Sequence, residues 1–490
     1  MATLISARAT SAASYTRTKA PTSRELHMMK RFGQGHSRAL FQQMRAAGGE
    51  TAWFEQQLDP DAVPQTATAL AVPSWFPALR RSATTKRATD SDGSYNTYEY
   101  ATDLANYTLQ MRINSSRPLF ETMVDFWSTH LHVNARDFPS FVQRYSYDEM
   151  LRENALGTFE DLLIAATTHP AMLMFLDNCE SVKNRPNENH GRELLELHTV
   201  GRVSGYTETM VKDSAKILSG WTIRSDYDAY YDPNRHTTGA VSVLDFQHPN
   251  TSADGEAMSL DYLRYLARHE LTARTVCRKL AVRFVSDDPP AALVDELVQT
   301  YLSSGTDIKA VLRTLVGSEV FWASVGQKVR SPVDDVVASV RALGVQVKAP
   351  TGRSSFAHEL SVSIKSVKLF QWPRPDGPPD TADAWCSASR MLASWRNHWG
   401  LAGGYWPDGQ AVYRKPASYL PQDRIRFDLL VDHVSRTVLG KPSTDRLLQA
   451  ACEGLDVPPG EIVTAGHKVV KYRFNRLLAV LLDSPEHMSR

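Results

Sequence analysis

Helical periodicity runs through most of this chain and constrains its fold more than any other feature of the sequence. Apolar residues recur every three or four positions in segments such as YEYATDLANYTLQMRI and PLFETMVDFWSTHLHV, which is the spacing of one helix face. Start and stop signals bracket such segments: Ser37 and Ser331–Pro332 are expected at helix N-termini, and Gly48 at a C-terminus. The sequence therefore predicts an all-α protein, a large multi-helix orthogonal bundle.

Two long stretches interrupt this periodicity. Residues 223–258 are rich in Asp, Tyr, Asn and Gly, and residues 344–383 end in the Pro-rich FQWPRPDGPPD. Structureless segments of this length inside a compact protein are usually functional or disordered. GAVSVLDF, in the first stretch, predicts a short strand or a hairpin arm. We therefore expect long irregular insertions and at most a small β-hairpin, and we expect the polar residues 79–97 to form a loop.

The domain organisation follows from the same patterns. Residues 1–22 are polar, lack the apolar region of a signal peptide and predict a disordered leader. No clear linker divides the remainder, so residues 23–490 are expected to form a single all-α domain. No apolar run approaches the roughly 20 residues that span a bilayer, so no transmembrane segment is expected. The absence of a visible signal favours a cytoplasmic location.

Charge and cysteine content exclude several classes of protein. The formal net charge is only +1, so no strong field attracts nucleic acid, and nucleic-acid binding is not expected. The four cysteines are far apart and form no C-x-x-C pair, which predicts reduced thiols rather than a thiolate zinc site or a disulfide framework. Motifs for phosphate loops, serine nucleophiles, zinc proteases and dinucleotide binding are absent.

The densest group of ligand-type side chains is NENHGRELLELH, which begins at Asn187. Much of it fits an ordinary buried helix. Asn187 or Asn189 would cap the N-terminus, Arg192 and Glu196 would pair across one turn, and Gly201 would end the helix. This interpretation gives most of the polar residues a structural role.

Glu193 fits that structural interpretation poorly. It lies on the stripe that begins at His190 and is partly directed toward the leucine side of the helix. A carboxylate in such a place needs a cation, a proton or a metal ion. The His-x-x-Glu spacing suits chelation, although the second copy that di-iron bundles use is missing. The segment therefore predicts either a structural Asn/Arg/Glu network or a metal-binding or catalytic carboxylate at Glu188 or Glu193.

Several motifs occur in the order found in a known family. RPNENHGRELLELHTVG followed by GYTE and LSGWT resembles the signature of the bacterial family known as domain of unknown function 1800. MMKRFGQG, FWSTHLHV, DPNRHTTG and CRKLAVRFVSDDPP resemble its other motifs, so that the likeness covers roughly residues 24–485. The chain departs from the family pattern at Ser128, His190 and Thr237, where the family has a histidine, an aromatic residue and an aspartate.

The resemblance implies partners and candidate residues rather than a reaction, because the family carries no established common activity. Members are often exported and are often encoded beside sulfatase-like proteins, so export and a sulfatase-like partner are expectations from the resemblance. His130 and His236 match histidines of the family motifs, and Glu188, Arg192 and Glu193 lie in its signature.

These residues make up the predicted site. His236 lies in the first irregular stretch, where loop residues often carry function, and neutral imidazole is both a common metal ligand and a general base near pH 7. If His130, Glu193 and His236 converge, they form a His/carboxylate site for a divalent metal ion, with Glu188 and Arg192 as further catalytic candidates. The competing interpretation of each histidine is a hydrogen-bonded core residue.

Two functions remain open from the sequence. The leading hypothesis is an enzyme of unknown substrate with metal-assisted chemistry slightly favoured. The alternative is a non-catalytic binding or assembly protein that partners a sulfatase-like protein. Aromatic residues in or beside the irregular stretches suit ligand or partner contact as well as packing. These are Trp221, Tyr227, Tyr230, Tyr231, Trp372 and Trp385.

Overall fold

Helices dominate the structure, which is a computed structural model that describes residues 15–351, 355–364 and 368–490. The mostly-α class predicted from the sequence is therefore confirmed. The described residues also contain four two-stranded antiparallel sheets, where the sequence predicted at most one small hairpin. None of the helices in the described part of the chain has the length and apolar character needed to cross a membrane.

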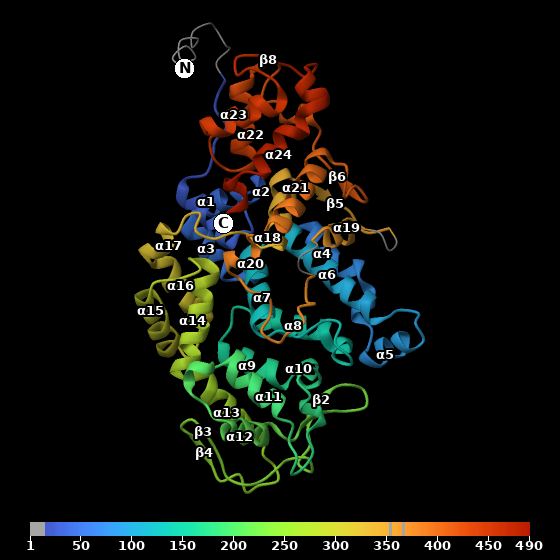
Figure 1. The fold of residues 1–490 in the computed structure, drawn as a ribbon, viewed down its shortest axis with the longest axis vertical. Helices are drawn as coiled ribbons and strands as arrows, with labels where there is room; N and C mark the ends of the chain where they lie inside the picture. The colour runs from blue at the N-terminus through green and yellow to red at the C-terminus, as the bar shows by residue number, and fades with distance from the viewer. Residues whose placement is uncertain (1–14, 352–354, 365–367) are drawn as a thin grey trace. The chain divides into compact units, whose positions relative to one another are not determined.

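The chain divides into two compact units (Figure 1). Unit 1 comprises Met1–Trp53, Asp334–Ser363 and Ser387–Arg490. Unit 2 comprises Phe54–Val333 and Ile364–Cys386.

Unit 1 consists of helices and two of the small sheets, β5–β6 and β7–β8. Its elements are α1 (Ser23–Phe32), α2 (Arg38–Ala47), β5 (Gln346–Val347), α19 (Phe356–Ser363), α21 (Ala388–Gly403), β6 (Ala411–Val412), η7 (Pro416–Tyr419), β7 (Ile425–Arg426), α22 (Phe427–Val438), α23 (Asp445–Leu455), β8 (Ile462–Val463), the π-helical turn η8 (Val469–Arg473), α24 (Phe474–Leu482) and α25 (Pro485–Met488). The unit boundaries fall within α3 (Glu50–Gln57) and α18 (Pro332–Leu343).

Local capping explains where the first helices of unit 1 begin. The Thr22 hydroxyl accepts the Glu25 backbone N–H, and the Glu25 carboxylate accepts the Thr22 backbone N–H, which is a capping box. The Ser37 hydroxyl caps α2, and Gly48 ends α2 in the left-handed conformation, as the sequence predicted. Residues 1–14 of the predicted leader lie outside the described residues, whereas Tyr15 hydrogen-bonds to His433 at 3.1 Å.

Unit 2 contains the longer run of helices and the other two sheets, β1–β2 and β3–β4. Its elements up to the first sheet are η1 (Pro60–Ala62), α4 (Ala67–Trp75), η2 (Pro77–Arg80), α5 (Ala83–Ser91), α6 (Thr97–Asn114), α7 (Pro118–His130), η3 (Ser140–Gln143), α8 (Arg144–Asn154), α9 (Phe159–Thr168), α10 (Pro170–Phe175), η4 (Asn178–Glu180), α11 (Glu188–Glu193), the π-helical turn η5 (Leu194–His198), η6 (Arg202–Ser204) and α12 (Glu208–Leu218).

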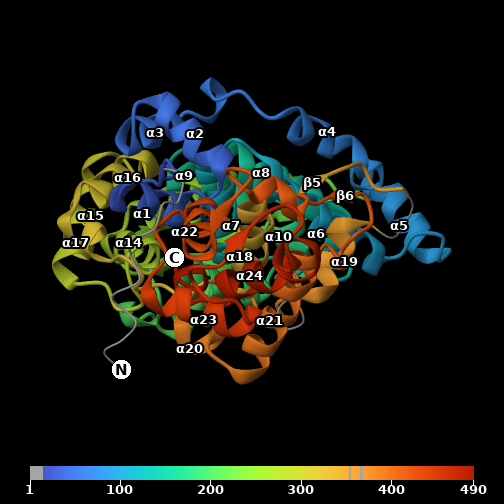
Figure 2. The same ribbon diagram turned by 90° about the horizontal axis from the view of Figure 1, so that it is seen from above.

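The remaining elements of unit 2 begin with the two hairpins. They are β1 (Trp221–Ile223), β2 (Ala229–Tyr231), β3 (Val241–Val243), β4 (Phe246–His248), α13 (Glu256–Arg268), α14 (Glu270–Phe284), α15 (Ala291–Ser303), α16 (Ile308–Gly317), α17 (Glu319–Ala323) and α20 (Ala382–Trp385). Figures 1 and 2 show α14, α15 and α16 side by side, and α14–α15 and α15–α16 contacts hold this layer together.

The irregular stretches are more ordered than their composition suggested. In residues 223–258, β1 pairs with β2 and β3 pairs with β4, and β3 lies within the predicted hairpin arm GAVSVLDF.

The expectation of a loop over residues 79–97 is wrong, because the helix α5 occupies much of that segment. The Ser82 hydroxyl caps α5 by accepting the Thr85 N–H at 3.1 Å, a local signal that polar composition obscured.

Candidate functional site

The motif that begins at Asn187 forms a short α-helix, α11, that continues as the π-helical turn η5. The Asn187 side chain caps α11 by accepting the Asn189 backbone N–H at 2.9 Å. Gly201, with a φ of 76°, ends the segment by donating its N–H to the Leu195 carbonyl at 2.8 Å. Both termini were predicted from the sequence. The π turn was not predicted, and such turns occur frequently at functional sites.

The predicted ion pair between Arg192 and Glu196 is wrong. Arg192 instead makes a two-point ion pair with Glu208, at 2.7 and 2.6 Å. Glu196 accepts a hydrogen bond from Arg202 at 2.7 Å. The physical reason is the π turn, which begins after α11 and removes Glu196 from the position one α-helical turn beyond Arg192.

Glu188 and Glu193 occupy different environments. Glu188 is part-exposed and lies 3.6 Å from Arg192, an arrangement that contributes little energy. Glu193 is half-buried, and burial followed by the charge of Glu196 raises the pKa of its carboxyl. Within the described residues, Glu193 makes no ion pair. Among those residues it therefore lacks the arginine partner that the structural interpretation expected, and its catalytic role stays a prediction.

His236 is a buried residue of the loop that follows β2. Its Nδ1 lies 2.9 Å from the Ser219 carbonyl oxygen, and its Nε2 lies 2.7 Å from Asn250 Oδ1. The Asn250 amide in turn donates to the Thr237 carbonyl at 2.9 Å. Both ring nitrogens are therefore engaged in holding the loop, and neither faces Glu193 or His130 as a ligand.

His130 ends α7 beneath the π turn. Its Nε2–H donates to the His198 carbonyl at 3.1 Å, which leaves Nδ1 to accept a hydrogen bond from the Lys279 ammonium at 2.8 Å. Lys279 also approaches the Leu197 carbonyl at 3.4 Å. Burial, reinforced by the charge of Lys279, lowers the pKa of His130 well below its usual value, so this imidazole is neutral. The π turn thus supplies carbonyls to a His130–Lys279 pair.

Lys279 is the functional candidate that the sequence analysis missed. It lies on α14 in CRKLAVRFV, where a lysine beside an arginine resembles any surface position of an amphipathic helix. Burial lowers the pKa of its ammonium to about 8, against the opposing charge of Asp376. In the described part of the chain, Lys279 has no carboxylate ion-pair partner, because its hydrogen bonds go to the neutral His130 and to a backbone carbonyl.

A cavity of about 680 Å³ opens beside the His130–Lys279 pair, entirely within unit 2. Its volume is typical of sites for small organic molecules. The end of α7, one face of α14 and residues 368–385 form its walls. Three lining residues are aspartates: Asp125, Asp376 and Asp380. Eight are cationic: Arg112, Arg202, Arg274, Arg278, Lys279, Arg283, Lys368 and Arg374.

Carboxylates balance most of this positive charge. Arg112 and Arg283 share Asp125, at 3.2 and 3.1 Å. The guanidinium groups of the remaining four arginines each pair with an acidic residue as well. The two lysines differ, since neither has a carboxylate ion pair among the described residues. Lys368 is exposed, so Lys279 is the unbalanced charge in the interior of the cavity.

The wall formed by residues 368–385 is the end of the predicted Pro-rich insertion. His132 Nε2–H donates to the Trp372 carbonyl at 3.0 Å and anchors this wall beyond the end of α7. Gly377 has a φ of 70°, and a Cβ there would lie 2.2 Å from the Thr129 carbonyl oxygen. Only glycine therefore allows the segment to pass this close to α7.

The aromatic residues singled out in the sequence have two kinds of environment. Trp372 and Trp385 line the cavity, where they offer apolar surface to a ligand. Trp221 and Tyr231 instead pack edge to face across the β1–β2 hairpin, with ring centroids 5.5 Å apart. Ligand contact thus remains open for the first pair, and packing accounts for the second.

The predicted three-ligand metal site of His130, Glu193 and His236 is not assembled. Their potential ligand atoms are not all within 4.8 Å of one another, because each side chain is held by a different part of unit 2. In the described residues, a cluster that meets this distance exists in unit 1, on three segments that the sequence analysis did not select. It comprises Asp335, His398 and His487.

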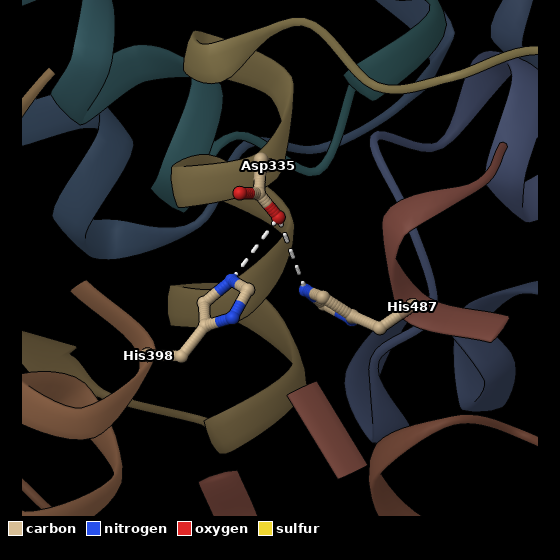
Figure 3. A group of neighbouring side chains, drawn as sticks. All are labelled: Asp335, His398 and His487. Atoms are coloured by element: carbon tan, nitrogen blue, oxygen red, sulfur yellow. Dashed lines mark hydrogen bonds and ion pairs between the residues drawn. The ribbon is translucent and has the colours of Figure 1, made fainter. Parts of the chain in front are cut away.

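This cluster joins α18, α21 and α25, and its side chains point toward one another (Figure 3). His398 Nε2 and His487 Nε2 lie 3.2 and 3.6 Å from Asp335 Oδ1. Although burial lowers the pKa of His398, the charges of Asp335 and Asp483 raise it to about 9. Burial likewise opposes ionisation of Asp335, yet the neighbouring histidines and Arg390 hold its pKa well below the usual range. Without a metal ion, protonated His398 and ionised Asp335 therefore form a fully buried ion pair.

Comparison with known proteins places nearly the whole chain in one family. No curated protein and no solved structure shows significant similarity to the chain. A family model described as "Protein of unknown function (DUF1800)" matches residues 27–489, which span both units and include the residues of the cavity and of the Asp335 cluster. The chain therefore belongs to the DUF1800 family.

Proposed function

We propose that the cavity of unit 2 binds a small organic anion and that Lys279 contacts its anionic group. The observation that carries this proposal is the Lys279 ammonium, which lies in the cavity wall with only neutral hydrogen-bond partners. An ammonium removed from water is costly unless a counter-charge compensates it. A bound carboxylate, phosphate or sulfate group would supply that charge.

The remainder of the ligand is expected to be apolar or aromatic. Phe126, Leu271, Trp372 and Trp385 all line the cavity and offer surfaces for such a moiety. Sites of this size commonly combine apolar walls with a few well-placed polar groups. The paired arginines contribute to the electrostatic potential of the cavity, and Lys279 contacts the anionic group of the ligand directly.

The chemistry that these groups support is proton transfer, so the proposal is an enzyme with Lys279 as its general acid. An ammonium with a pKa of about 8 is mostly protonated at neutral pH yet gives up its proton readily. Neutral His130 orients the ammonium by accepting a hydrogen bond from it at Nδ1. The unbalanced charge of Lys279 disfavours a divalent cation in this cavity, so the proposal does not include metal-assisted chemistry there.

Turnover of chromogenic anionic esters tests this function. The purified full chain is assayed with nitrophenyl phosphate, nitrophenyl sulfate and a nitrophenyl ester that carries a carboxylate, beside uncharged nitrophenyl acetate. We expect turnover of at least one anionic ester that Lys279→Met abolishes. Lys368→Met, which replaces an exposed lysine of the same cavity, should leave that turnover within about twofold. Equal turnover by Lys279→Met, or turnover of the uncharged ester alone, would refute the proposed role of Lys279.

One observation favours non-catalytic binding as a second function. Leu392, Trp395 and Trp399 lie at helical spacing on α21 with exposed fractions of 63%, 45% and 46%. Large apolar residues that form one stripe on a helix are typical of protein interfaces. The sulfatase-like partner expected from the resemblance is the protein to test, by co-purification with the tagged chain. Loss of the partner in Trp395→Ser with Trp399→Ser would support this function, and retention would refute it.

A further inference from the structure

We propose that Asp335, His398 and His487 in unit 1 bind one divalent transition-metal ion of the zinc class. The three residues come from α18, α21 and α25, and their ligand atoms all lie within 4.8 Å of one another. Two imidazole nitrogens with one carboxylate oxygen suit zinc better than magnesium or calcium, which prefer all-oxygen sites. This site is separate from the anion cavity and does not depend on the function proposed for unit 2.

Two of the three separations between the ligand atoms are close to those of a tetrahedral metal site. With metal–ligand distances of about 2.0–2.1 Å, neighbouring ligand atoms of a tetrahedral zinc ion lie about 3.3 Å apart. The separations from Asp335 Oδ1 are 3.2 Å to His398 Nε2 and 3.6 Å to His487 Nε2. The 3.2 Å separation is also compatible with a direct hydrogen bond, whereas the 3.6 Å separation of His487 is too long for one.

Hydrogen bonds around the cluster orient its ligand atoms. His398 Nδ1 lies 2.8 Å from Asp483 Oδ1, an arrangement that fixes the Nδ1–H tautomer and directs Nε2 toward Asp335 (Figure 3). The Ser394 hydroxyl donates to Asp335 Oδ2 at 2.7 Å, which leaves Oδ1 facing both imidazoles. A carboxylate behind a histidine ligand and a donor behind a carboxylate ligand are the usual supports of protein metal sites.

The burial of the cluster indicates a structural rather than a catalytic ion. The exposed fractions of the side chains are 1% for Asp335, 0% for His398 and 4% for His487, so in the described part of the chain all three are shielded from solvent and from a substrate. Ser339 Oγ donates to the Asp335 backbone carbonyl at 2.9 Å and lies 2.8 Å from His487 Nε2, so its lone pair could complete the coordination. A closed ion at this place would fasten the C-terminal helix α25 to α18 and α21.

Metal analysis of the full chain tests the site. The protein is produced with its affinity tag removed, dialysed against zinc and then against metal-free buffer, and analysed by mass spectrometry for bound zinc. We expect about one zinc per chain in the wild type and in His467→Gln, whose side chain pairs with Glu461 elsewhere in unit 1. We expect that zinc to be lost in the double variant His398→Gln with His487→Gln. Equal zinc content in the wild type and the double variant would overturn the proposal.

Cobalt substitution keeps the test decisive if the double variant does not fold. Cobalt(II) in a tetrahedral nitrogen and oxygen site gives intense visible absorption bands, whereas octahedral cobalt gives weak ones. Intense bands from the cobalt-loaded wild type, together with a Tm that falls when a chelator removes the metal, would support the site. Weak bands only, or a Tm that the chelator leaves unchanged, would show that the cluster is a metal-free ion pair.

Discussion

Anion binding in the unit 2 cavity should weaken as the pH rises through about 8. The ammonium of Lys279 is the charge that we expect a ligand to contact, and burial lowers its pKa to about 8. A group with that pKa is about nine-tenths protonated at pH 7 and about one-tenth protonated at pH 9. Because binding requires the protonated form, affinity should fall by about tenfold over this range.

Fluorescence titration with anilinonaphthalene sulfonate measures this dependence, since the sulfonate stays ionised throughout the range and the aromatic body suits the apolar walls. Lys279→Met should bind about 10- to 100-fold more weakly at pH 7, which corresponds to the value of one hydrogen bond to a charged group. It should also lose the pH dependence. Lys279→Arg should bind with little change in affinity up to pH 9, because its charge does not titrate there. A flat profile for the wild type, or the same slope in Lys279→Met, would refute the assignment.

Three further substitutions in unit 2 test a buried charge cluster, a buried imidazole and the cavity wall. Arg152→Met leaves the buried carboxylates of Glu121 and Asp148 without their shared cation and should lower the free energy of unfolding in urea by about 3–5 kcal/mol. Burial raises the pKa of Glu121, so its carboxyl is protonated as the pH falls. The difference in free energy of unfolding between the wild type and Arg152→Met should therefore become smaller at low pH. His190→Phe should be neutral or stabilising by about 1 kcal/mol in the same assay, since both buried ring nitrogens lack a hydrogen-bond partner in the described residues. Gly377→Ala should displace the cavity wall and weaken sulfonate binding by about tenfold.

The outcomes that would contradict these predictions are distinct. Arg268→Met removes an exposed cation that pairs with Glu160 and should change the free energy of unfolding far less than Arg152→Met does. An equal loss in the two variants would contradict the buried-charge argument. Destabilisation of His190→Phe by more than about 2 kcal/mol would show that this imidazole has a bound partner such as water. Unchanged sulfonate affinity in Gly377→Ala would show that the wall formed by residues 368–385 does not contribute to anion binding.

Local patterns in the sequence predicted the helices well, because helix termini depend on nearby residues. The sequence showed the N-caps at Ser37 and Asn187. It also showed the glycines that end helical segments, Gly48 and Gly201. The π turn after α11 was not, since its residues also fit a regular helix. That turn decides which carbonyls meet His130 and which residue pairs with Arg192.

The candidate sites depend on contacts that no local pattern encodes. His130 was recognisable through the family motif, but Lys279 is one of many lysines on amphipathic helices, and only its distance to His130 distinguishes it. Asp335, His398 and His487 lie far apart along the chain and match no ligand spacing. The adjacent aspartates in SPVDDVVASV were an available signal, because a helix with that apolar pattern directs one of them into the core.

Diffraction from crystals soaked in bromide would test the central claim most directly, because the anomalous signal of bromide locates bound anions. The structure predicts a bromide within hydrogen-bonding distance of Lys279 Nζ inside the cavity, and the loss of that peak in Lys279→Met. A cavity that holds no bromide in wild-type crystals whose surface sites are filled, or a peak that persists unchanged in Lys279→Met, would contradict the assignment of Lys279 as the anion-binding residue.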